Sequence, residues 1–260
     1  MTIQEFIDWL KTSLRIEWRE TPIDVFLYGD PGVELKNVAV TMMATQSVLE
    51  KAVRGGCNLV ITHEPLFYNH HHKFQHLLDD AVYKAKEKYL GDHRLCVFHL
   101  HDNLHQAGLD YIAAGMAQKL GWEKYRTDDS LKSFSMAGVK LGRILRDIDV
   151  GLEPTAVRYI GDKDVVYENV VTSWGFMGME GGVRLINRHE SCVLITGETH
   201  EWEVVEYVHD AHHQGLRKAL VVTGHVPSEE SGVEFFCDHL REKAPSLSIF
   251  YIKTDDLFEK

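Results

Sequence analysis

Three short segments of the chain end in the same kinds of side chain. They are VITHEP (residues 60–65), LITGETHE (residues 194–201) and VVTGHVPSEE (residues 221–230). Each is an apolar run, then threonine, then a turn that carries histidine or glutamate. A fourth segment, VFHLHDNLH (residues 97–105), is similar but lacks the threonine. Neutral imidazoles and carboxylates at rigid strand ends are ligands for divalent zinc, manganese, iron, nickel or cobalt.

The spacing inside these segments would bring several of the side chains together. His225 and Glu229 are four residues apart, so a helix would place them on one face. The HDxxH pattern of His101, Asp102 and His105 has a spacing that a turn would gather. Both patterns are therefore candidate ligand clusters.

His63 and Glu64 are adjacent, and Pro65 restricts Glu64 to an extended backbone. Neighbours in an extended chain point in opposite directions. Only a turn, or two metals, would let both side chains ligate, and the proline favours two metals.

Each motif alone also has a structural explanation. A single histidine at a strand end is usually hydrogen-bonded within the fold. Glu198 and Glu229 would also suit helix N-termini, where the helix dipole favours negative charge. The recurrence of four such segments favours the metal interpretation. The histidine run at residues 70–72, with His76, is predicted to be a solvated loop, with a lid or entrance as the alternative, and it is not counted among the ligands.

The strand ends need buried strands to position them, and the apolar pattern supplies these. Strand-like runs cover residues 38–43, 58–62, 95–100, 139–145, 156–160, 169–172, 192–196, 219–223 and 247–252. Helical periodicity covers residues 3–14, 47–54, 77–89, 110–120, 201–212 and 232–240. Alternating short strands and helices predict an α/β fold. Ligands bind such sheets beyond the carboxyl ends of the strands.

We predict a two-lobed mixed-sheet fold with helices packed on the sheets and a metal site at strand ends between the lobes. The polar stretch at residues 121–135 suggests the boundary. The N-terminal lobe, residues 1–125, would carry THEP and HDNLH. The C-terminal lobe, residues 126–260, would carry TGE and GHxxxE, with the lobes packed as one unit. The glycines between residues 175 and 182 lack the spacing of a phosphate loop and predict a flexible loop.

Composition narrows the function classes. The 260 residues carry a net charge of −11, which disfavours nucleic-acid binding, and include 16 histidines. The sequence contains no run of 18 apolar residues, so no membrane span is predicted. The N-terminus lacks the features of a signal peptide. The four cysteines are scattered, and three lie in or beside apolar runs as expected for buried thiols. A cytoplasmic location is the resulting expectation.

The four motifs, in this order, resemble those of the NIF-three-like dinuclear metal-centre family, also known as GTP cyclohydrolase I type 2 homologues. That family shows T-H-H-P, H-T-N-L-D, T-G-E and G-H-x-x-x-E. Here the corresponding residues are 62–65, 101–105, 196–198 and 224–229. The resemblance implies two divalent metal ions, of zinc, iron, manganese or nickel, in a toroidal homohexamer. The cyclohydrolase name is a weak guide to activity.

Carried over by position, the resemblance implies metal ligands at the following residues: His63, Glu64, His105, His225 and Glu229. Two positions depart from the family. Glu64 replaces the second histidine of the pair, and His105 replaces an aspartate that normally bridges the metals. The bridge would then come from Glu64, from Asp102 or from a hydroxide, so the second metal depends on this rearrangement.

The resulting hypothesis is a metal-dependent hydrolase that acts on a nucleotide, a phosphoester or a cyclic amide. Asp102 would be a sixth ligand, and Glu198 or His101 would act as general base or orient a ligand. The alternative is a metal-binding regulatory or chaperone-like assembly without turnover, since storage needs no open coordination position. A structural α/β protein with hydrogen-bonded histidines is the third interpretation.

Overall fold

The computed structural model describes residues 1–14, 16–106 and 110–258. The chain forms two compact units. Unit 1 consists of Met1–Tyr111 and Val233–Asp255. Unit 2 consists of Ile112–Gly232 and the chain end from Asp256.

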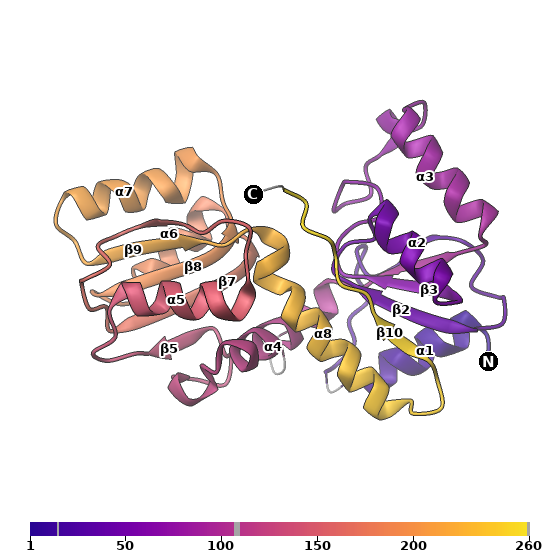
Figure 1. The fold of residues 1–260 in the computed structure, drawn as a ribbon, viewed down its shortest axis with the longest axis horizontal. Coiled ribbons are helices and arrows are strands. Elements are labelled where there is room, and N and C mark those ends of the chain that lie inside the picture. Colours follow the sequence, from indigo (N-terminus) through magenta and orange to yellow (C-terminus); the bar gives the residue numbers. More distant parts are fainter. Residues whose placement is uncertain (15, 107–109, 259–260) are drawn as a thin grey trace. The chain divides into compact units, whose positions relative to one another are not determined.

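Unit 1 contains a five-stranded sheet in the order β1-β4-β3-β2-β10 (Figure 1). Its strands are β1 (Phe26–Tyr28), β2 (Asn37–Thr41), β3 (Cys57–Thr62), β4 (Cys96–His99) and β10 (Ile249–Tyr251). The strands from β4 to β10 are parallel, and only β1 runs antiparallel to its neighbour. The central strands are buried on both faces, which explains their uninterrupted apolar runs.

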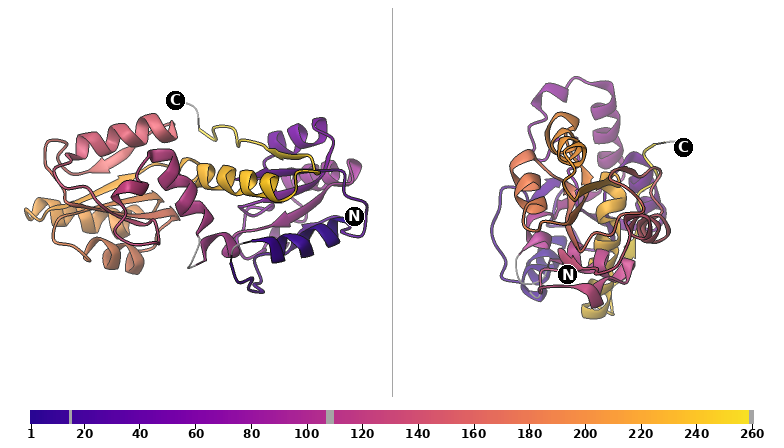
Figure 2. Two further views of the ribbon diagram at one scale, coloured as in Figure 1. Left: turned by 90° about the horizontal axis from the view of Figure 1, so that it is seen from below. Right: turned by 90° about the vertical axis from the view of Figure 1, so that its left-hand side faces the viewer.

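Helices cover both faces of this sheet. On one face, α2 (Gln46–Arg54) and α3 (Ala81–Asp92) share a hydrophobic core with Ala39, Val60 and Val97 of the strands. On the other face lies α1 (Ile3–Ser13), whose four buried apolar residues repeat at helical spacing (Figure 2). Its start is fixed by a capping box between Thr2 and Glu5. Short 3₁₀ turns, η1 (Gln75–Leu77) and η2 (Asp102–His105), lie in the loops.

Unit 2 contains a second five-stranded sheet in the order β5-β7-β8-β9-β6. Its strands are β5 (Ser133–Ser135), β6 (Arg158–Ile160), β7 (Asn169–Phe176), β8 (Cys192–Glu198) and β9 (Lys218–Val222). The central strands β7, β8 and β9 are parallel, and both edge strands are antiparallel. Each unit therefore has a parallel centre with at least one antiparallel edge.

The helices of unit 2 also lie on both faces of their sheet. One core joins α6 (Met179–Ile186), the π-helical turn η4 (Glu201–Val205) and α7 (Glu206–His213) to Val171, Leu194 and Leu220. The opposite face carries α5 (Leu141–Leu152) (Figure 2). The remaining elements are α4 (Tyr111–Leu120), η3 (Glu123–Tyr125) and α8 (His225–Lys243), and the last of these begins in unit 2 and ends in unit 1.

The mixed α/β fold and most of its elements confirm the sequence pattern, with three differences. Residues 139–145 were expected to be a strand, yet α5 begins at Leu141. The apolar alternation around Leu141 resembles a strand, but the buried set Leu141, Ile144 and Ile148 follows the helical period. Strands β1 and β5 and helix α6 were not predicted. Gly175 lies in β7, while Gly181 and Gly182 lie in α6, so these glycines do not form the expected flexible loop.

The predicted division at residue 125 differs from the two compact units. The reason is β10, which pairs in parallel with β2 through the register of Ile249 with Val38. This pairing draws the segment Val233–Asp255 into unit 1. A pairing between strands so far apart in the sequence leaves no local signal. The predicted boundary therefore depended only on the polar composition of residues 121–135.

Among the described residues no helix is long and apolar enough to cross a membrane. The four cysteines are free and buried, as expected of thiols in apolar runs. Burial raises the pKa of Cys57 to about 11 and that of the other three to about 12. These thiols therefore stay protonated near neutral pH, which makes them poor metal ligands and poor nucleophiles.

Lys86 on α3 is an unusual buried cation and gives the first prediction. Its ammonium donates to the carbonyl of Leu66 at 2.7 Å and lies 5.0 Å from the Tyr68 ring. Burial lowers the pKa of Lys86 to about 8. The unfolded chain, with its pKa near the ordinary value, thus binds more protons between pH 8 and 10.5.

Stability attributable to Lys86 should therefore rise with pH across that window, by up to about 3 kcal/mol. Urea unfolding of the wild type and of Lys86→Met at pH 7.5 and pH 10 would measure it. The free energy of unfolding of the wild type should rise relative to that of Lys86→Met at the higher pH. An unchanged difference between the two proteins would mean that Lys86 keeps an ordinary pKa in the fold.

Candidate metal centre

The candidate residues of unit 1 lie beyond the carboxyl ends of two adjacent parallel strands. Strand β3 ends at Thr62 and β4 ends at His99, and these two residues are paired in the sheet. His63 follows β3 directly, and the HDNLH segment follows β4. The register thus places the two motifs at one edge of one sheet, as the sequence predicted.

His63 is 1 % exposed. A hydrogen bond determines which of its ring nitrogens carries the proton. Its Nδ1 lies 3.1 Å from the carbonyl oxygen of Leu100. A carbonyl oxygen only accepts, so Nδ1 must carry the proton. In the neutral ring Nε2 then bears a lone pair. A hydrogen bond from the far nitrogen to a backbone carbonyl is the usual way in which proteins orient a metal-binding imidazole.

The lone pair of His63 faces a second imidazole. Nε2 of His105 lies 3.2 Å from Nε2 of His63, and Nδ1 of His105 lies 3.5 Å from the Asp110 carboxylate. Asp110 is buried, and its carboxylate beside Nδ1 favours the tautomer of His105 that carries the proton on Nδ1. Two donor atoms bound to one tetrahedral ion at about 2.1 Å would lie roughly 3.4 Å apart. The spacing of the two nitrogens fits a shared divalent metal.

His101 completes a group of three imidazoles. Its ring stacks on His63, with centroids 4.7 Å apart, and lies 4.8 Å from the His105 ring. One ligand atom from each of the three rings falls within 4.8 Å of the others. The sequence assigned His101 a role as base or orienting group, whereas the structure places it among the potential ligands. Its position at the first residue after Leu100, beyond the strand end, was the available signal.

Asp102 lies beside His101 and is held in its ionised form. Its carboxylate accepts a hydrogen bond from Nδ1 of His101 at 2.9 Å. This bond is the main cause that holds the pKa of Asp102 below its usual value. An ionised carboxylate next to three imidazoles is a mixed N/O donor set of the kind that zinc, iron, nickel and manganese accept.

Asp24 holds the backbone of the HDNLH segment through hydrogen bonds. It was not among the residues predicted from the sequence. It is 3 % exposed. Its two carboxylate oxygens accept from the backbone N–H groups of His101 (2.6 Å), Asp102 (3.0 Å) and Asn103 (2.9 Å). These are the N–H groups at the start of η2, which no backbone carbonyl satisfies. Asp24 therefore fixes the turn that aims His101, Asp102 and His105.

His99 and Glu64 also border the site. His99 is fully buried, and its Nε2 lies 2.9 Å from the carbonyl oxygen of His63. Burial and the neighbouring histidines lower the pKa of His99 to about 3, so its ring is neutral. Burial is likewise the main cause that lowers the pKa of His70, and the charge of Glu64 opposes the lowering at both His99 and His70.

The candidate residues of unit 2 lie in the same way beyond β8 and β9, which are parallel neighbours. His225 begins α8, and its Nδ1 lies 3.1 Å from Oε1 of Glu198 at the end of β8. Its Nε2 lies 3.2 Å from Oε2 of Glu229, which is 2 % exposed. The His225 ring thus has a carboxylate at each nitrogen. The pattern fits one orienting carboxylate and one carboxylate that would share a metal with Nε2.

Two glycines make room for this arrangement. A Cβ on Gly175 would lie 2.5 Å from Oε1 of Glu229, and the φ of Gly175 is +71°. A Cβ on Gly197 would overlap the Ser228 hydroxyl. That hydroxyl accepts from the Gly175 N–H at 2.9 Å and donates to the carbonyl of His225 at 2.6 Å. The glycine of the TGE motif is therefore needed for close approach of α8 to the strands.

The threonine that recurs at the strand ends has a structural role. Thr62 Oγ1 lies 2.9 Å from the carbonyl of Glu64 and also accepts from the Ala44 N–H. Thr196 Oγ1 bonds the carbonyl of Glu198 in the same way, at 3.4 Å. These hydroxyls hold the chain in the turn that follows each strand. They explain the recurring motif without being ligands.

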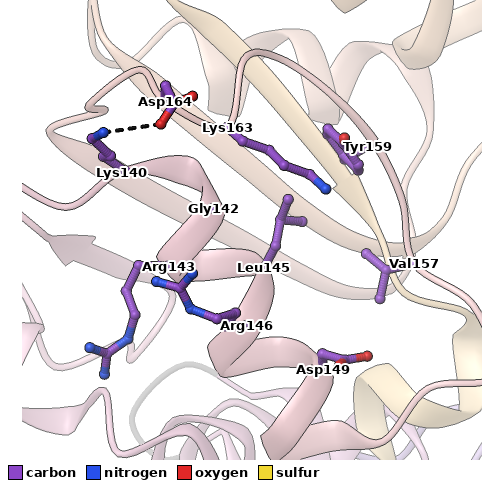
Figure 3. Close-up of a pocket in the computed structure, with 10 residues that line it drawn as sticks. All are labelled: Lys140, Gly142, Arg143, Leu145, Arg146, Asp149, Val157, Tyr159, Lys163 and Asp164. Atoms are coloured by element: carbon purple, nitrogen blue, oxygen red, sulfur yellow. Dashed lines mark hydrogen bonds and ion pairs between the residues drawn. The ribbon is translucent and has the colours of Figure 1, made fainter.

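Unit 2 also has an exposed aromatic surface and an open pocket. An exposed row of rings lies next to Glu198: Phe176, its partner in the sheet, contacts His200, and His200 stacks on Trp202 at 4.6 Å. A separate open pocket of about 540 Å³ lies beside α5 and β6 (Figure 3). Its lining includes Lys140 and Arg143, which pair with Asp164 and Asp147, and also Arg146 and Lys163.

Asp24 gives a prediction for the centre. Asp24→Ala leaves three backbone N–H groups without their acceptor, so the free energy of unfolding should fall by about 2 to 3 kcal/mol. Zinc affinity should fall as well, because the HDNLH turn loses its support. Urea unfolding and zinc titration measure the two effects. Asp30→Ala, which removes an exposed carboxylate bonded to the Gly32 N–H, is the control. Wild-type zinc affinity in Asp24→Ala would contradict the assignment.

Comparison with solved structures supports the fold. A Bacillus cereus protein related to NIF3 has a TM-score of 0.78 at 13 % identity and covers 100 % of this chain and 99 % of its own. Staphylococcus aureus protein SA1388 gives 0.74 at 15 % identity, with the same coverage. Reduced HcgD from Methanocaldococcus jannaschii gives 0.71 at 18 %, with 98 % of each chain covered. No curated protein sequence matches the chain.

The family resemblance carried by the four motifs is confirmed along the chain. The family model of Duf34/NIF3 (NGG1p interacting factor 3) matches residues 1–256. With the candidate groups of His, Asp and Glu, this family fits a metal-binding protein. The chain belongs to the Duf34/NIF3 family.

Proposed function

We propose that this protein binds divalent metal ions through its strand-end histidines and carboxylates and uses them in a hydrolytic reaction. The observation that carries the metal proposal is the pair of Nε2 atoms of His63 and His105. They face each other at 3.2 Å, while each Nδ1 is turned towards an oxygen. Two lone pairs at that distance repel each other unless a cation or a proton lies between them. The oxygen atoms at both Nδ1 positions favour the cation.

The proposed ligand set keeps the predicted residues and adds one. His63, Glu64, Asp102, His105, His225 and Glu229 were predicted from the motifs, and His101 joins them because of its place in the imidazole group. The geometry within unit 1 supports His63, His101 and His105 as a set. The geometry within unit 2 supports His225 and Glu229, whose donor atoms are 3.2 Å apart.

A bound divalent ion would supply Lewis acidity, which polarises a phosphoryl or carbonyl oxygen and lowers the pKa of water. The protein would supply orientation and proton transfer. Glu198 has a half-exposed carboxylate that also holds Nδ1 of His225. We propose that it orients His225 and accepts a proton from water, as the sequence suggested. His101 is bonded to Asp102, and a role as ligand suits it better than a role as base.

The exposed rings beside Glu198 bear on the substrate. Trp202 is 71 % exposed and Phe176 is 49 % exposed, which is unusual for large apolar side chains. The His200 ring stacks almost parallel on Trp202, while Phe176 meets His200 at 62°. The exposed indole of Trp202 offers a flat face on which a planar ring can stack. Among the predicted substrates, these exposed rings therefore favour nucleotides and cyclic amides with planar rings over simple phosphoesters.

The alternative is a metal-binding regulatory or chaperone-like protein without turnover. The abundance of imidazoles around His63 favours it, because a protein that stores or transfers metal gains from several neighbouring ligands. The homohexamer, the cytoplasmic location and the number and identity of the ions all stay predictions.

Metal content tests the first part of the proposal. The full chain, prepared without a histidine tag and loaded with zinc, should retain metal after gel filtration. His63→Ala and His225→Ala should each lose at least one equivalent, because each removes a ligand. His76→Ala, which removes an exposed histidine outside the site, should match the wild type. Elemental analysis gives the numbers, and less than about 0.2 zinc per wild-type chain would leave only the structural interpretation.

Turnover tests the second part. Protein loaded separately with zinc, manganese, iron or nickel would be screened against nucleotides, phosphoesters and cyclic amides. At least one substrate with a planar ring should be hydrolysed, and His63→Ala should abolish that activity. Trp202→Ala should raise KM while metal content stays unchanged. Consistent inactivity with tightly retained metal would favour the regulatory alternative.

A further inference from the structure

Unit 2 has an open pocket of about 540 Å³ that the candidate metal centre does not use (Figure 3). It lies between α5 and β6, and the turn that follows β6 closes one side of it. All of these elements belong to Ile112–Gly232, so the pocket is complete within one unit. None of the lining residues is a candidate metal ligand. The volume falls in the range of small-molecule sites, and the pocket therefore needs a ligand chemistry of its own.

Backbone hydrogen bonds fix the two walls of this pocket relative to each other. The Leu141 N–H donates to the carbonyl of Val165 at 3.0 Å. The Gly142 N–H donates to the carbonyl of Lys163 at 2.9 Å. A Cβ on Gly142 would lie 3.2 Å from that same carbonyl, so glycine suits the close approach of the walls. Because these two N–H groups at the start of α5 are already bonded, a ligand would be recognised by side chains rather than by the helix end.

The side chains give the pocket an excess of positive charge, although the whole chain carries a net charge of −11. Two of its four cations are paired with carboxylates, as described above. The other two, Arg146 and Lys163, form no ion pair within the described part of the chain. The four cations face three carboxylates: Asp147, Asp149 and Asp164. Guanidinium and ammonium groups bind phosphate through charge-assisted hydrogen bonds, so the two unpaired cations favour a phosphate group.

An apolar surface lies next to the unpaired cations. Leu145 of α5 and Val157 and Tyr159 on the opposite wall line the same space (Figure 3). Tyr159 is 40 % exposed, and the Lys163 ammonium lies 5.1 Å from the centroid of its ring. A phosphate bound by Lys163 would therefore lie beside a ring that can pack against an organic group. The Asp149 carboxylate repels phosphate but accepts hydrogen bonds from hydroxyl groups, which suits a hydroxylated ester of phosphate.

We propose that this pocket binds a small phosphate ester with a hydroxylated organic part. The phosphate lies at Arg146 and Lys163, and the organic part packs against Tyr159. This binding needs no metal ion and is independent of the hydrolytic function proposed above. It is also separate from the exposed rings beside Glu198, none of which lines the pocket. An open site with exposed cations releases its ligand readily, so it suits a ligand whose concentration is sensed rather than a permanently held cofactor.

The test is calorimetric titration of the full chain with inorganic phosphate, ribose 5-phosphate and adenosine monophosphate (AMP). EDTA in the buffer keeps divalent ions away from the candidate metal centre. Both esters should bind the wild type more tightly than inorganic phosphate does. Arg146→Gln and Lys163→Gln should each weaken both esters by about fivefold, the upper range for an exposed ion pair.

Tyr159 distinguishes the two esters. Tyr159→Ala should weaken AMP by about tenfold, because the base loses an aromatic ring on which to stack. It should weaken ribose 5-phosphate less, since that ester has no planar ring. Tyr159→Phe keeps the ring and should bind both esters as the wild type does. Wild-type affinity for AMP in Tyr159→Ala would overturn the role of this wall.

Arg188→Gln is the matched control, because it removes an exposed arginine of the same unit that lies outside the pocket. It should titrate as the wild type, and an equal loss there would reduce the binding to non-specific charge attraction. Trp202→Ala should also leave both affinities unchanged. AMP binding that is lost in Trp202→Ala but kept in Arg146→Gln and Lys163→Gln would overturn the pocket. A wild type that binds neither ester would overturn it as well, while metal retention, measured separately, still decides the proposed function.

Discussion

The candidate centre depends on one hydrogen bond, from Nδ1 of His63 to the carbonyl oxygen of Leu100. That carbonyl is available because β4 ends at His99 beside the end of β3, and the two strands are parallel. The bond fixes both the tautomer and the direction of the His63 ring. Without this bond the proton of His63 could lie on Nε2, which would then have no lone pair for a metal. The 3.2 Å between Nε2 of His63 and Nε2 of His105 would then not indicate a shared ion. The sheet register therefore determines the orientation of the donor nitrogen of His63.

Carboxylates at the far ring nitrogens or at the backbone then orient the other donors. Asp24 holds the backbone of η2, Asp110 lies at Nδ1 of His105, and Glu198 lies at Nδ1 of His225. None of the three needs to touch the ion. Each places an imidazole or a turn, and each supplies negative charge that offsets a bound cation. The same solution occurs in both units, at the ends of parallel strands, and this fits the recurrence of the strand-end motif along the chain.

The sequence predicted the parts of this arrangement that have a local signal. Apolar runs that stop at a polar residue predicted the ends of β3 and β9 and placed His63 and His225 beyond them. Asp24 had no such signal, because its role depends on a contact with residues 77 positions away. The run at residues 70–72 was misjudged for the same reason. Its packing depends on His99, and only the fold brings that residue near.

The departures from the family pattern bear on which metal the centre favours. Exchange of histidine for Glu64 and of aspartate for His105 keeps the total number of imidazoles and carboxylates in the two motifs. Unit 1 nevertheless gathers His63, His101 and His105 within one group, which is rich in nitrogen. Magnesium and calcium prefer oxygen ligands, and magnesium also retains several waters. Three imidazole nitrogens therefore discriminate against both ions. The donor set therefore favours zinc, iron, nickel or cobalt, and manganese only where Glu64 and Asp102 contribute.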